Sequence, residues 1–213
     1  MIFNLQSVKN DLKVDIKGVI HVGAFDGQEL TSYRSLNLFN TILFEPQKVM
    51  YDIVKQKCIV DETVHNFALG ADNFESEMFI SDKAGGIANG ASQSSSILEP
   101  SVHLTEHPDI TFPTKETITV KRFDGFASDA GINMQNYNML NIDVQGYELE
   151  VLKGFGDLLN HVELIIAEVN RDDVYKDCAQ IEDIDEYLSK YSLDRASVYW
   201  QSTSWGDAIY VRK

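Results

Sequence analysis

Two carboxyl groups and an amide lie at the end of the apolar segment Asn138–Asp143 and just after it. Asp143, Gln145 and Glu148 fall within one turn between a predicted strand and a predicted helix. Two carboxyl groups and an amide placed this closely can orient a hydroxyl group and remove its proton. Glu148 has a second interpretation, because an acid in the first turn of a helix is stabilised by the helix dipole. We predict that Asp143, Gln145 and Glu148 are catalytic residues.

A turn bounded by glycines, Gly23-Ala24-Phe25-Asp26-Gly27, follows the β-branched segment Gly18–Gly23. Glycine lets a backbone pass close to a ligand, and the helix expected next presents free N–H groups at its start. The signal is weak when taken alone. It also lacks the Gly-x-Gly-x-x-Gly spacing of dinucleotide-binding proteins, which argues against a dehydrogenase.

An acid, Glu45, ends the second apolar segment, Thr41–Phe44, and precedes Pro46. Ligands of open α/β sheets lie outside the carboxyl ends of the strands, and a carboxylate at this place can accept both hydroxyls of a cofactor ribose. The alternative is a solvated acid at a strand end. At the third predicted strand, Ala68 and Leu69 either flank an adenine ring or belong to the core.

Further polar residues are expected in the part of the site that binds the substrate. Glu168 and Asn170 end the apolar segment Val162–Val169, and His103 lies in a stretch rich in small residues. We predict that these three side chains bind the substrate. Asp143, Glu168 and Asn170 together could also hold a divalent cation through oxygen ligands, although we expect no metal.

The elements that must position these residues alternate along the chain. Strands are predicted at Gly18–Gly23, Thr41–Phe44, Thr63–Leu69, Asn138–Asp143, Val162–Val169, Leu193–Tyr199 and Asp207–Val211, and further extended segments at Glu75–Ser81 and Thr117–Arg122. Helical spacing of apolar residues is found at Gln28–Leu38, near Val49–Val54, at Phe123–Asp129, at Glu148–Leu159 and at Ile181–Tyr191. Such alternation predicts a mostly parallel sheet with helices on both faces.

The last two predicted strands have no helix between them, which implies one antiparallel strand near the C-terminal end. We therefore expect an α/β fold with a seven-stranded, Rossmann-like sheet in one domain, residues 1–213. Residues 82–113 show no sustained period. They are predicted to form a long loop over the site, with a disordered insertion as the alternative.

The charge balance excludes several classes of partner. The chain of 213 residues has 33 acidic and 18 basic side chains, a formal net charge of −15, which repels nucleic acid and anionic membrane surfaces. Cys58 and Cys178 lie far apart, so we expect no disulfide framework. No segment has the pattern of a signal peptide or of a membrane span. We expect a cytoplasmic protein without nucleic acid partners or integral membrane association.

Taken together, these segments resemble the FkbM-like methyltransferase family. The motifs are VIHVGAFDGQE, ILFEP, FALG, SSSILEP, VKRFDGF, IDVQGYELEVLKG and the following EVN, and the resemblance covers nearly the whole chain. It implies S-adenosylmethionine as the cofactor and a hydroxyl of a sugar, glycan or natural product as the methyl acceptor. The closing antiparallel strand pair is also usual in methyltransferases.

The resemblance carries cofactor-binding roles to particular positions. His21 stands where methyltransferases commonly have an acid, so contact with the methionine ammonium group falls to Asp26, Glu29 or Asp143. The expected cofactor-binding residues are His21, Gly23, Ala24, Asp26, Gly27, Glu29, Glu45, Pro46, Ala68, Leu69, Ser95 and Asp143.

The sequence thus predicts an S-adenosylmethionine-dependent O-methyltransferase whose partner is a small-molecule or carbohydrate acceptor. The alternatives are a metal-assisted O-methyltransferase of another acceptor class and an inactive, cofactor-binding scaffold protein. N-methylation of nucleic acid is disfavoured by the negative charge and because no Asn-Pro-Pro-Tyr type turn follows the fourth strand. Neither the acceptor nor the oligomeric state follows from the sequence.

Overall fold

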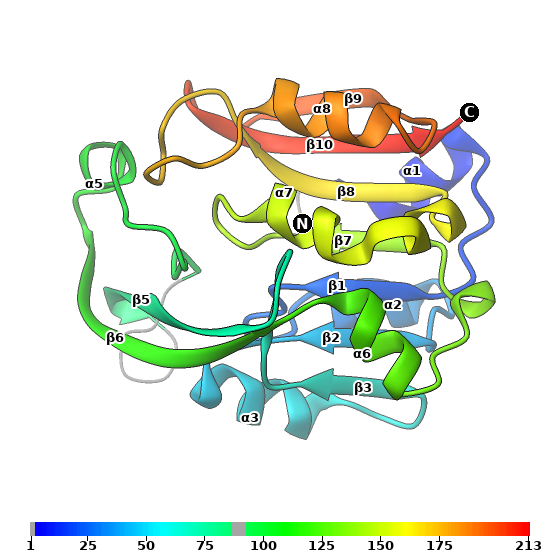
Figure 1. Cartoon of the computed structure of the whole chain (residues 1–213), viewed down its shortest axis with the longest axis horizontal. Coiled ribbons are helices and arrows are strands. Elements are labelled where there is room, and N and C mark those ends of the chain that lie inside the picture. The colour runs from blue at the N-terminus through cyan, green and yellow to red at the C-terminus, as the bar shows by residue number, and fades with distance from the viewer. Residues whose placement is uncertain (1–2, 87–92) are drawn as a thin grey trace.

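A seven-stranded sheet forms the centre of the computed structural model, which describes residues 3–86 and 93–213 (Figure 1). The strand order is β3-β2-β1-β7-β8-β10-β9. The strands are β1 (Val19–Val22), β2 (Thr41–Phe44), β3 (Glu62–His65), β7 (Met139–Ile142), β8 (Leu164–Asn170), β9 (Leu193–Trp200) and β10 (Trp205–Arg212). Pairing is parallel from β3 to β8, whereas β10 runs antiparallel to β8 and β9. The predicted Rossmann-like sheet with one antiparallel strand is confirmed.

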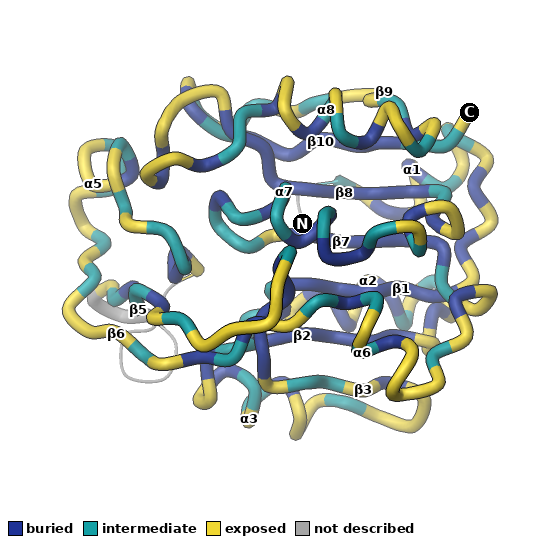
Figure 2. Tube along the Cα trace, in the orientation of Figure 1, coloured by how far each residue is buried: buried dark blue, intermediate teal, exposed yellow. Residues whose placement is uncertain are grey.

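Helices cover both faces of this sheet (Figure 1). They are α1 (Leu5–Leu12), α2 (Leu30–Ser35), α3 (Lys48–Lys57), α6 (Phe123–Asp129), α7 (Glu148–Phe155) and α8 (Ile181–Ser189). Ile20 and Val22 of β1 pack into a core with α6, α7 and α8, while Val19 packs into a second core with α1, α2 and α3. A strand covered on both faces places successive side chains in opposite cores. The central strands are accordingly buried along their length (Figure 2).

A second sheet, of order β4-β6-β5, extends beyond the carboxyl ends of the main strands (Figure 1). Its strands are β4 (Ala68–Leu69), β5 (Phe74–Gly86) and β6 (Ile110–Lys121). The predicted loop at residues 82–113 is therefore wrong at both ends, because β5 and β6 pair antiparallel into this region. A short helix, α5 (His103–Glu106), lies between them. Residues 87–92 of the predicted loop lie outside the described residues.

The predicted strand Thr63–Leu69 is divided between the two sheets. Its first part, β3, pairs with β2, and its last two residues, β4, pair with β6. Between them, the Asn66 amide donates hydrogen bonds to the carbonyls of Glu45 (3.0 Å) and Pro46 (2.8 Å). These bonds hold the chain in a bend that directs it from one sheet to the other. The extended segment Thr117–Arg122 likewise belongs to the second sheet rather than the main one.

Two short 3-10 helices, η1 (Met134–Asn136) and η2 (Gly156–His161), complete the connections around β7 and β8. Across the two described ranges, 3–86 and 93–213, no helix has the length and apolar character needed to cross a membrane.

Candidate active site

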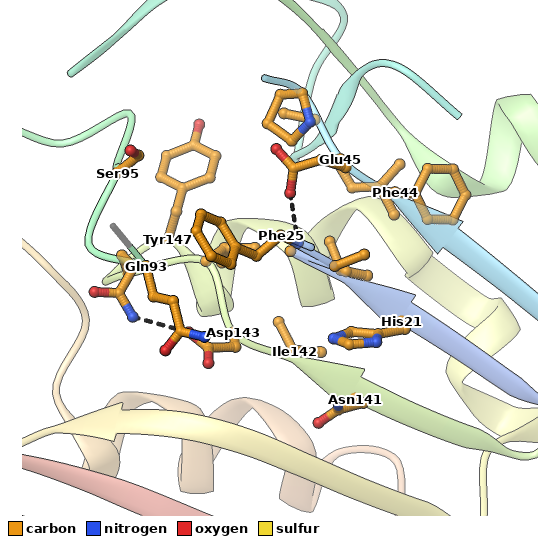
Figure 3. A pocket seen from close by; sticks show the side chains of 18 of the residues that line it. His21, Phe25, Phe44, Glu45, Gln93, Ser95, Asn141, Ile142, Asp143 and Tyr147 are labelled. Atoms are coloured by element: carbon orange, nitrogen blue, oxygen red, sulfur yellow. Dashed lines mark hydrogen bonds between the residues drawn. The ribbon is translucent and has the colours of Figure 1, made fainter. Parts of the chain in front are cut away.

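A deep cleft opens at the carboxyl ends of β1, β2 and β7, and we call it the first cleft (Figure 3). Its empty space is about 880 Å³, a figure that includes open solvent at the mouth. Most of the predicted cofactor residues line it: His21, Gly23, Ala24, Glu29, Glu45, Pro46, Ala68, Leu69, Ser95 and Asp143. The structure therefore brings together residues that span more than half of the chain.

The glycine turn after β1 is pressed against the end of β7. Gly23 has a φ of +84°, and a Cβ atom built on it would lie 1.8 Å from the carbonyl oxygen of Asp143. No other residue type fits there, because both the backbone conformation and the space require glycine. The N–H groups of Gly23 and Ala24 both donate to the carbonyl of Phe44, at 3.0 and 3.1 Å. The turn is thus fixed between the ends of β2 and β7.

The carboxyl group of Glu45 is buried and faces this turn (Figure 3). It accepts hydrogen bonds from the backbone N–H groups of Phe25 (2.7 Å) and Gln47 (2.8 Å). Burial raises the pKa of Glu45 to about 8, and the two backbone hydrogen bonds oppose that rise. Each carboxyl oxygen holds one backbone donor, so each keeps a lone pair for a ligand hydroxyl.

An apolar wall borders Glu45 in the first cleft. Phe44, Ala68, Leu69 and Met78 contribute to it. Ser95 adds a polar edge, and its hydroxyl is held at 3.0 Å from the hydroxyl of Ser81. Flat apolar surface beside a carboxyl group suits a ligand with an aromatic base joined to a polyol.

At the other side of the first cleft, His21 belongs to a buried polar chain. Its Nδ1 lies 3.3 Å from the Tyr33 hydroxyl, which accepts a hydrogen bond from the Asn141 amide at 2.9 Å. Burial lowers the pKa of His21, and the nearby Glu29 carboxylate opposes that shift. An uncharged His21 therefore supports the floor of the cleft, and the Glu29 carboxyl group lines the cleft beside it.

Two predicted cofactor residues lie outside the first cleft. Asp26 forms an ion pair with Lys57 at 3.0 Å, and a Cβ on Gly27 would point at Leu30 and Val54 instead of the cleft. Gly27 has a φ of +73°, so it serves the turn itself. Of the three acids proposed for the ammonium group, Glu29 and Asp143 line the cleft and Asp26 does not.

A second cavity, with an empty space of about 800 Å³, adjoins the first cleft. The predicted substrate residues His103 and Glu168 line it, together with Trp205. Asn170, predicted with them, lines neither space, although it is fully buried at the end of β8. The two spaces share the following lining residues: Gln28, Gln93, Asp143, Gln145 and Asp207. They meet at the end of β7.

Gln145 is the centre of the hydrogen-bond network at this junction. Its Nε2 donates to Oδ1 of Asp143 and to Oε2 of Glu168, both at 2.8 Å. The Tyr175 hydroxyl donates to its Oε1 at 2.8 Å, which fixes the orientation of the amide. The Ser96 hydroxyl donates to its backbone carbonyl at 2.7 Å. Gln145 has a φ of +59°, a strained conformation that this network holds in place.

The acids at the junction keep their protons more firmly than ordinary carboxyl groups. The Asp143 side chain is open to the empty space, yet its removal from bulk water raises its pKa to about 6, with the Gln145 amide opposing and Asp207 adding to the rise. Burial and the Asp143 charge raise the pKa of Glu168 well above its usual range. Burial also raises the pKa of Asp207. Such shifts are common where carboxyl groups are gathered for function.

Glu148, predicted to be catalytic, lies beneath the junction and lines neither space. It is completely buried, and its Oε1 accepts from the N–H groups of Val144 (3.1 Å) and Gly146 (3.2 Å). Its Oε2 has no hydrogen-bond partner among the described residues. Burial raises the pKa of Glu148 to about 7. The geometry suits support of the turn that carries Asp143 and Gln145.

The sequence reasoning missed the contribution of β10. Asp207 lines both spaces, and its carboxyl group accepts a hydrogen bond from Gln201. Trp205 lines the second cavity. The available signal was an acid at the start of an otherwise apolar strand, in register with Glu168 of β8.

A metal centre at this position would need Asp143, Glu168 and Asn170 together, and Asn170 does not reach the space that the other two line. In the described part of the chain, no group of three or more His, Cys, Asp and Glu side chains is arranged to hold a metal ion.

Comparisons with known proteins agree with this arrangement. A relative in Sinorhizobium fredii, the 2-O-methyltransferase NoeI, is 28% identical over 127 residues, which are 55% of this chain and 51% of the relative. The chain therefore spans about half the length of this curated relative.

Solved structures share the fold at low identity. The fibrillarin/Nop5p complex has a TM-score of 0.52 at 9% identity, covering 92% of this chain and 72% of the other. A putative tRNA (m1A22) methyltransferase of Streptococcus pneumoniae in complex with S-adenosylmethionine has a TM-score of 0.50 at 9% identity, covering 100% and 73%. A ribosomal protein L11 methylase of Lactobacillus delbrueckii subsp. bulgaricus has a TM-score of 0.50 at 9% identity, covering 99% and 77%.

The family comparison covers most of the region that builds the site, all but Gln201, Trp205 and Asp207. The model of the methyltransferase FkbM domain matches residues 21–194, from β1 through the start of β9. This range is well over half of the 213 residues. The chain therefore belongs to the FkbM-domain methyltransferase family.

Proposed function

We propose that this methyltransferase binds S-adenosylmethionine in the first cleft and methylates a hydroxyl group of a small, carbohydrate-like molecule held in the second cavity. The observation that carries the proposal is the junction of the two spaces at Asp143 and Gln145. A group-transfer enzyme needs its donor and acceptor sites to meet at a proton-accepting side chain, and these residues line both.

The lining of the first cleft fits S-adenosylmethionine. The two free lone pairs of Glu45 would accept the ribose hydroxyls, and the wall formed with Ala68 and Leu69 would cover the adenine. Glu29 and Asp143, which line the other side, would attract the methionine ammonium group. When bound, this cofactor supplies a methyl group activated by its sulfonium charge.

The protein's own part in the reaction is to position the acceptor and take its proton. The acceptor hydroxyl would give its proton to the Asp143 carboxylate while its oxygen bonds to the methyl carbon and the carbon–sulfur bond breaks. With a pKa of about 6, Asp143 is ionised at neutral pH and still basic enough to accept a proton. Gln145, fixed by Tyr175, would hold the carboxylate in one orientation.

The relative NoeI supports a hydroxyl as the acceptor, because it is named a 2-O-methyltransferase. The formal net charge of −15 disfavours a nucleic acid acceptor.

Calorimetric titration with S-adenosylhomocysteine, beside a nicotinamide dinucleotide control, tests the cofactor. Binding of S-adenosylhomocysteine alone, with a dissociation constant of about 10 µM or tighter, is expected. Binding of the dinucleotide alone would overturn the proposal. Binding of neither would leave the family's cofactor without a site here, and would equally contradict it.

A further inference from the structure

The second cavity is lined by acids. Three carboxyl groups contribute to its wall, those of Asp143, Glu168 and Asp207, and no Lys or Arg is found among the described residues of that wall. Glu168 and Asp207 are only 5% and 8% exposed. Buried acids that lie beside one another are unfavourable as anions, and a positive charge that joins them favours their ionised forms.

Binding of the cofactor does not account for all three of these acids. Glu29, Asp143 and Asp207 line the first cleft and can meet the positive charges of the cofactor there. Glu168 lines only the second cavity, so it is placed beyond the first cleft and beside the acceptor. A carboxyl group that serves no cofactor atom, and that a cationic neighbour would ionise, points to a feature of the acceptor itself.

The same cavity contains an independent sign of a missing ligand. His103 is 3% exposed, and its Nδ1 has no hydrogen-bond partner among the described residues. Burial lowers the pKa of His103 to about 4, so its imidazole is neutral and offers one nitrogen as an acceptor and the other as a donor. A buried polar atom of this kind is stabilised when a ligand hydroxyl or amine pairs with it.

An aromatic side chain completes the wall. Trp205 lines the cavity, and its ring lies 6.4 Å from the ring of His107. An indole ring attracts a cation over its face and also packs against the apolar face of a sugar ring. Carboxyl groups, a neutral imidazole and an indole therefore surround one space.

We propose that the acceptor is a polyhydroxylated molecule that carries a free ammonium group, such as an amino sugar, and that Glu168 with Asp207 binds that ammonium group. This inference rests on the proposed function and adds the chemical class of the acceptor. The Gln145 Nε2 group donates to Oδ1 of Asp143 and to Oε2 of Glu168, so Asp143 keeps its other carboxyl oxygen for the hydroxyl proton.

Matched probes separate the contribution of the ammonium charge to binding from the contribution of the sugar ring. The protein saturated with S-adenosylhomocysteine would be titrated with D-glucosamine and D-galactosamine, each beside its N-acetyl form and its parent sugar. Methyl transfer to the same probes would be measured with radiolabelled S-adenosylmethionine. We expect at least one free amine to bind or react at least about tenfold better than its two uncharged counterparts.

Variants then test whether the preference for the free amine arises from residues of the second cavity. Glu168→Gln is expected to remove the preference for the amine while S-adenosylhomocysteine binds as before, and Asp207→Asn to reduce it. Glu77→Gln is the matched control, because Glu77 lies on β5 and pairs with Lys115 at the surface. Unchanged binding of S-adenosylhomocysteine shows that each variant is folded.

Equal or better use of the uncharged sugars, no response to any amine, or a preference that survives in Glu168→Gln would overturn the inference. Failure of the proposed function looks different, since wild-type protein would then not bind S-adenosylhomocysteine at all.

Discussion

Replacing Glu45 with alanine gives a direct test of how the first cleft recognises its ligand. The proposal gives this carboxyl group both ribose hydroxyls, one on each oxygen beside the backbone donors of Phe25 and Gln47. Titrations at about pH 9, above the pKa of about 8, keep Glu45 ionised. A hydrogen bond to a charged group contributes about 1.5–3 kcal/mol, so the loss of two costs about 3–6 kcal/mol. At the lower value, S-adenosylhomocysteine should bind roughly 150-fold more weakly to Glu45→Ala.

Lost affinity alone would not prove the contact, because the same substitution frees two backbone N–H groups and loosens the turn. A double-mutant cycle separates these effects. The ligands are S-adenosylhomocysteine and its 2′,3′-dideoxy analogue, each titrated into wild type and Glu45→Ala. Wild type should prefer the hydroxylated ligand by about 3 kcal/mol, and the variant should bind both ligands almost equally.

One result of this cycle would refute the proposed contact between Glu45 and the ribose. If Glu45→Ala keeps the full preference for the hydroxylated ligand, the ribose is bound elsewhere and the carboxyl group only supports the turn. Thermal unfolding of the variant, recorded without ligand, measures the turn contribution separately.

Further predictions concern the turn and the junction. Gly23→Ala should lower the free energy of unfolding by about 2–5 kcal/mol, because its Cβ would lie 1.8 Å from the Asp143 carbonyl at a φ of +84°; Gly125→Ala, with nothing within 4 Å, should leave the melting temperature unchanged or raise it. Asp143→Asn should lower the rate of methyl transfer by about 10²–10⁴-fold and weaken S-adenosylhomocysteine binding far less, because Glu29 still faces the ammonium group; an equal rate would remove Asp143 as the base. Burial raises the pKa of Asp143 to about 6, so the wild-type rate should fall about tenfold per pH unit below that value, as the carboxyl group gains its proton. This acidic limb should be absent from the residual rate of Asp143→Asn.

Many residues of the first cleft were predictable from the sequence, because each comes directly after a predicted strand. Glu45 comes directly after a short apolar strand, and in a parallel sheet the residue after a strand lies at the ligand edge. The same rule placed Gly23 and Asp143 correctly in the cleft. It failed for Asp26, whose direction is set by Lys57, a partner 31 residues away.

The ends of β5 and β6 could not be predicted from the sequence, for a different reason. Residues 82–113 are rich in small and polar side chains, so no period marks a strand. Asp82 and Lys83 are nevertheless part of β5, because they pair with Thr111 and Ile110 across the ribbon. Pairing between strands depends on the partner strand, and local composition does not contain that information.

The direction of β10 explains why its contribution to the second cavity was not predicted from the sequence. Parallel strands bring the residues at their carboxyl ends to the site, and Glu168 near the end of β8 follows that rule. Because β10 runs the opposite way, it brings its first residues, Trp205 and Asp207, to the same edge, in register with the end of β8. Gln201, in the connection from β9, arrives there with them. The antiparallel strand that marks this fold class thus also supplies part of the proposed acceptor wall, and Trp205, which lines the second cavity and not the first cleft, is where a substitution can alter acceptor choice without a change in the first cleft.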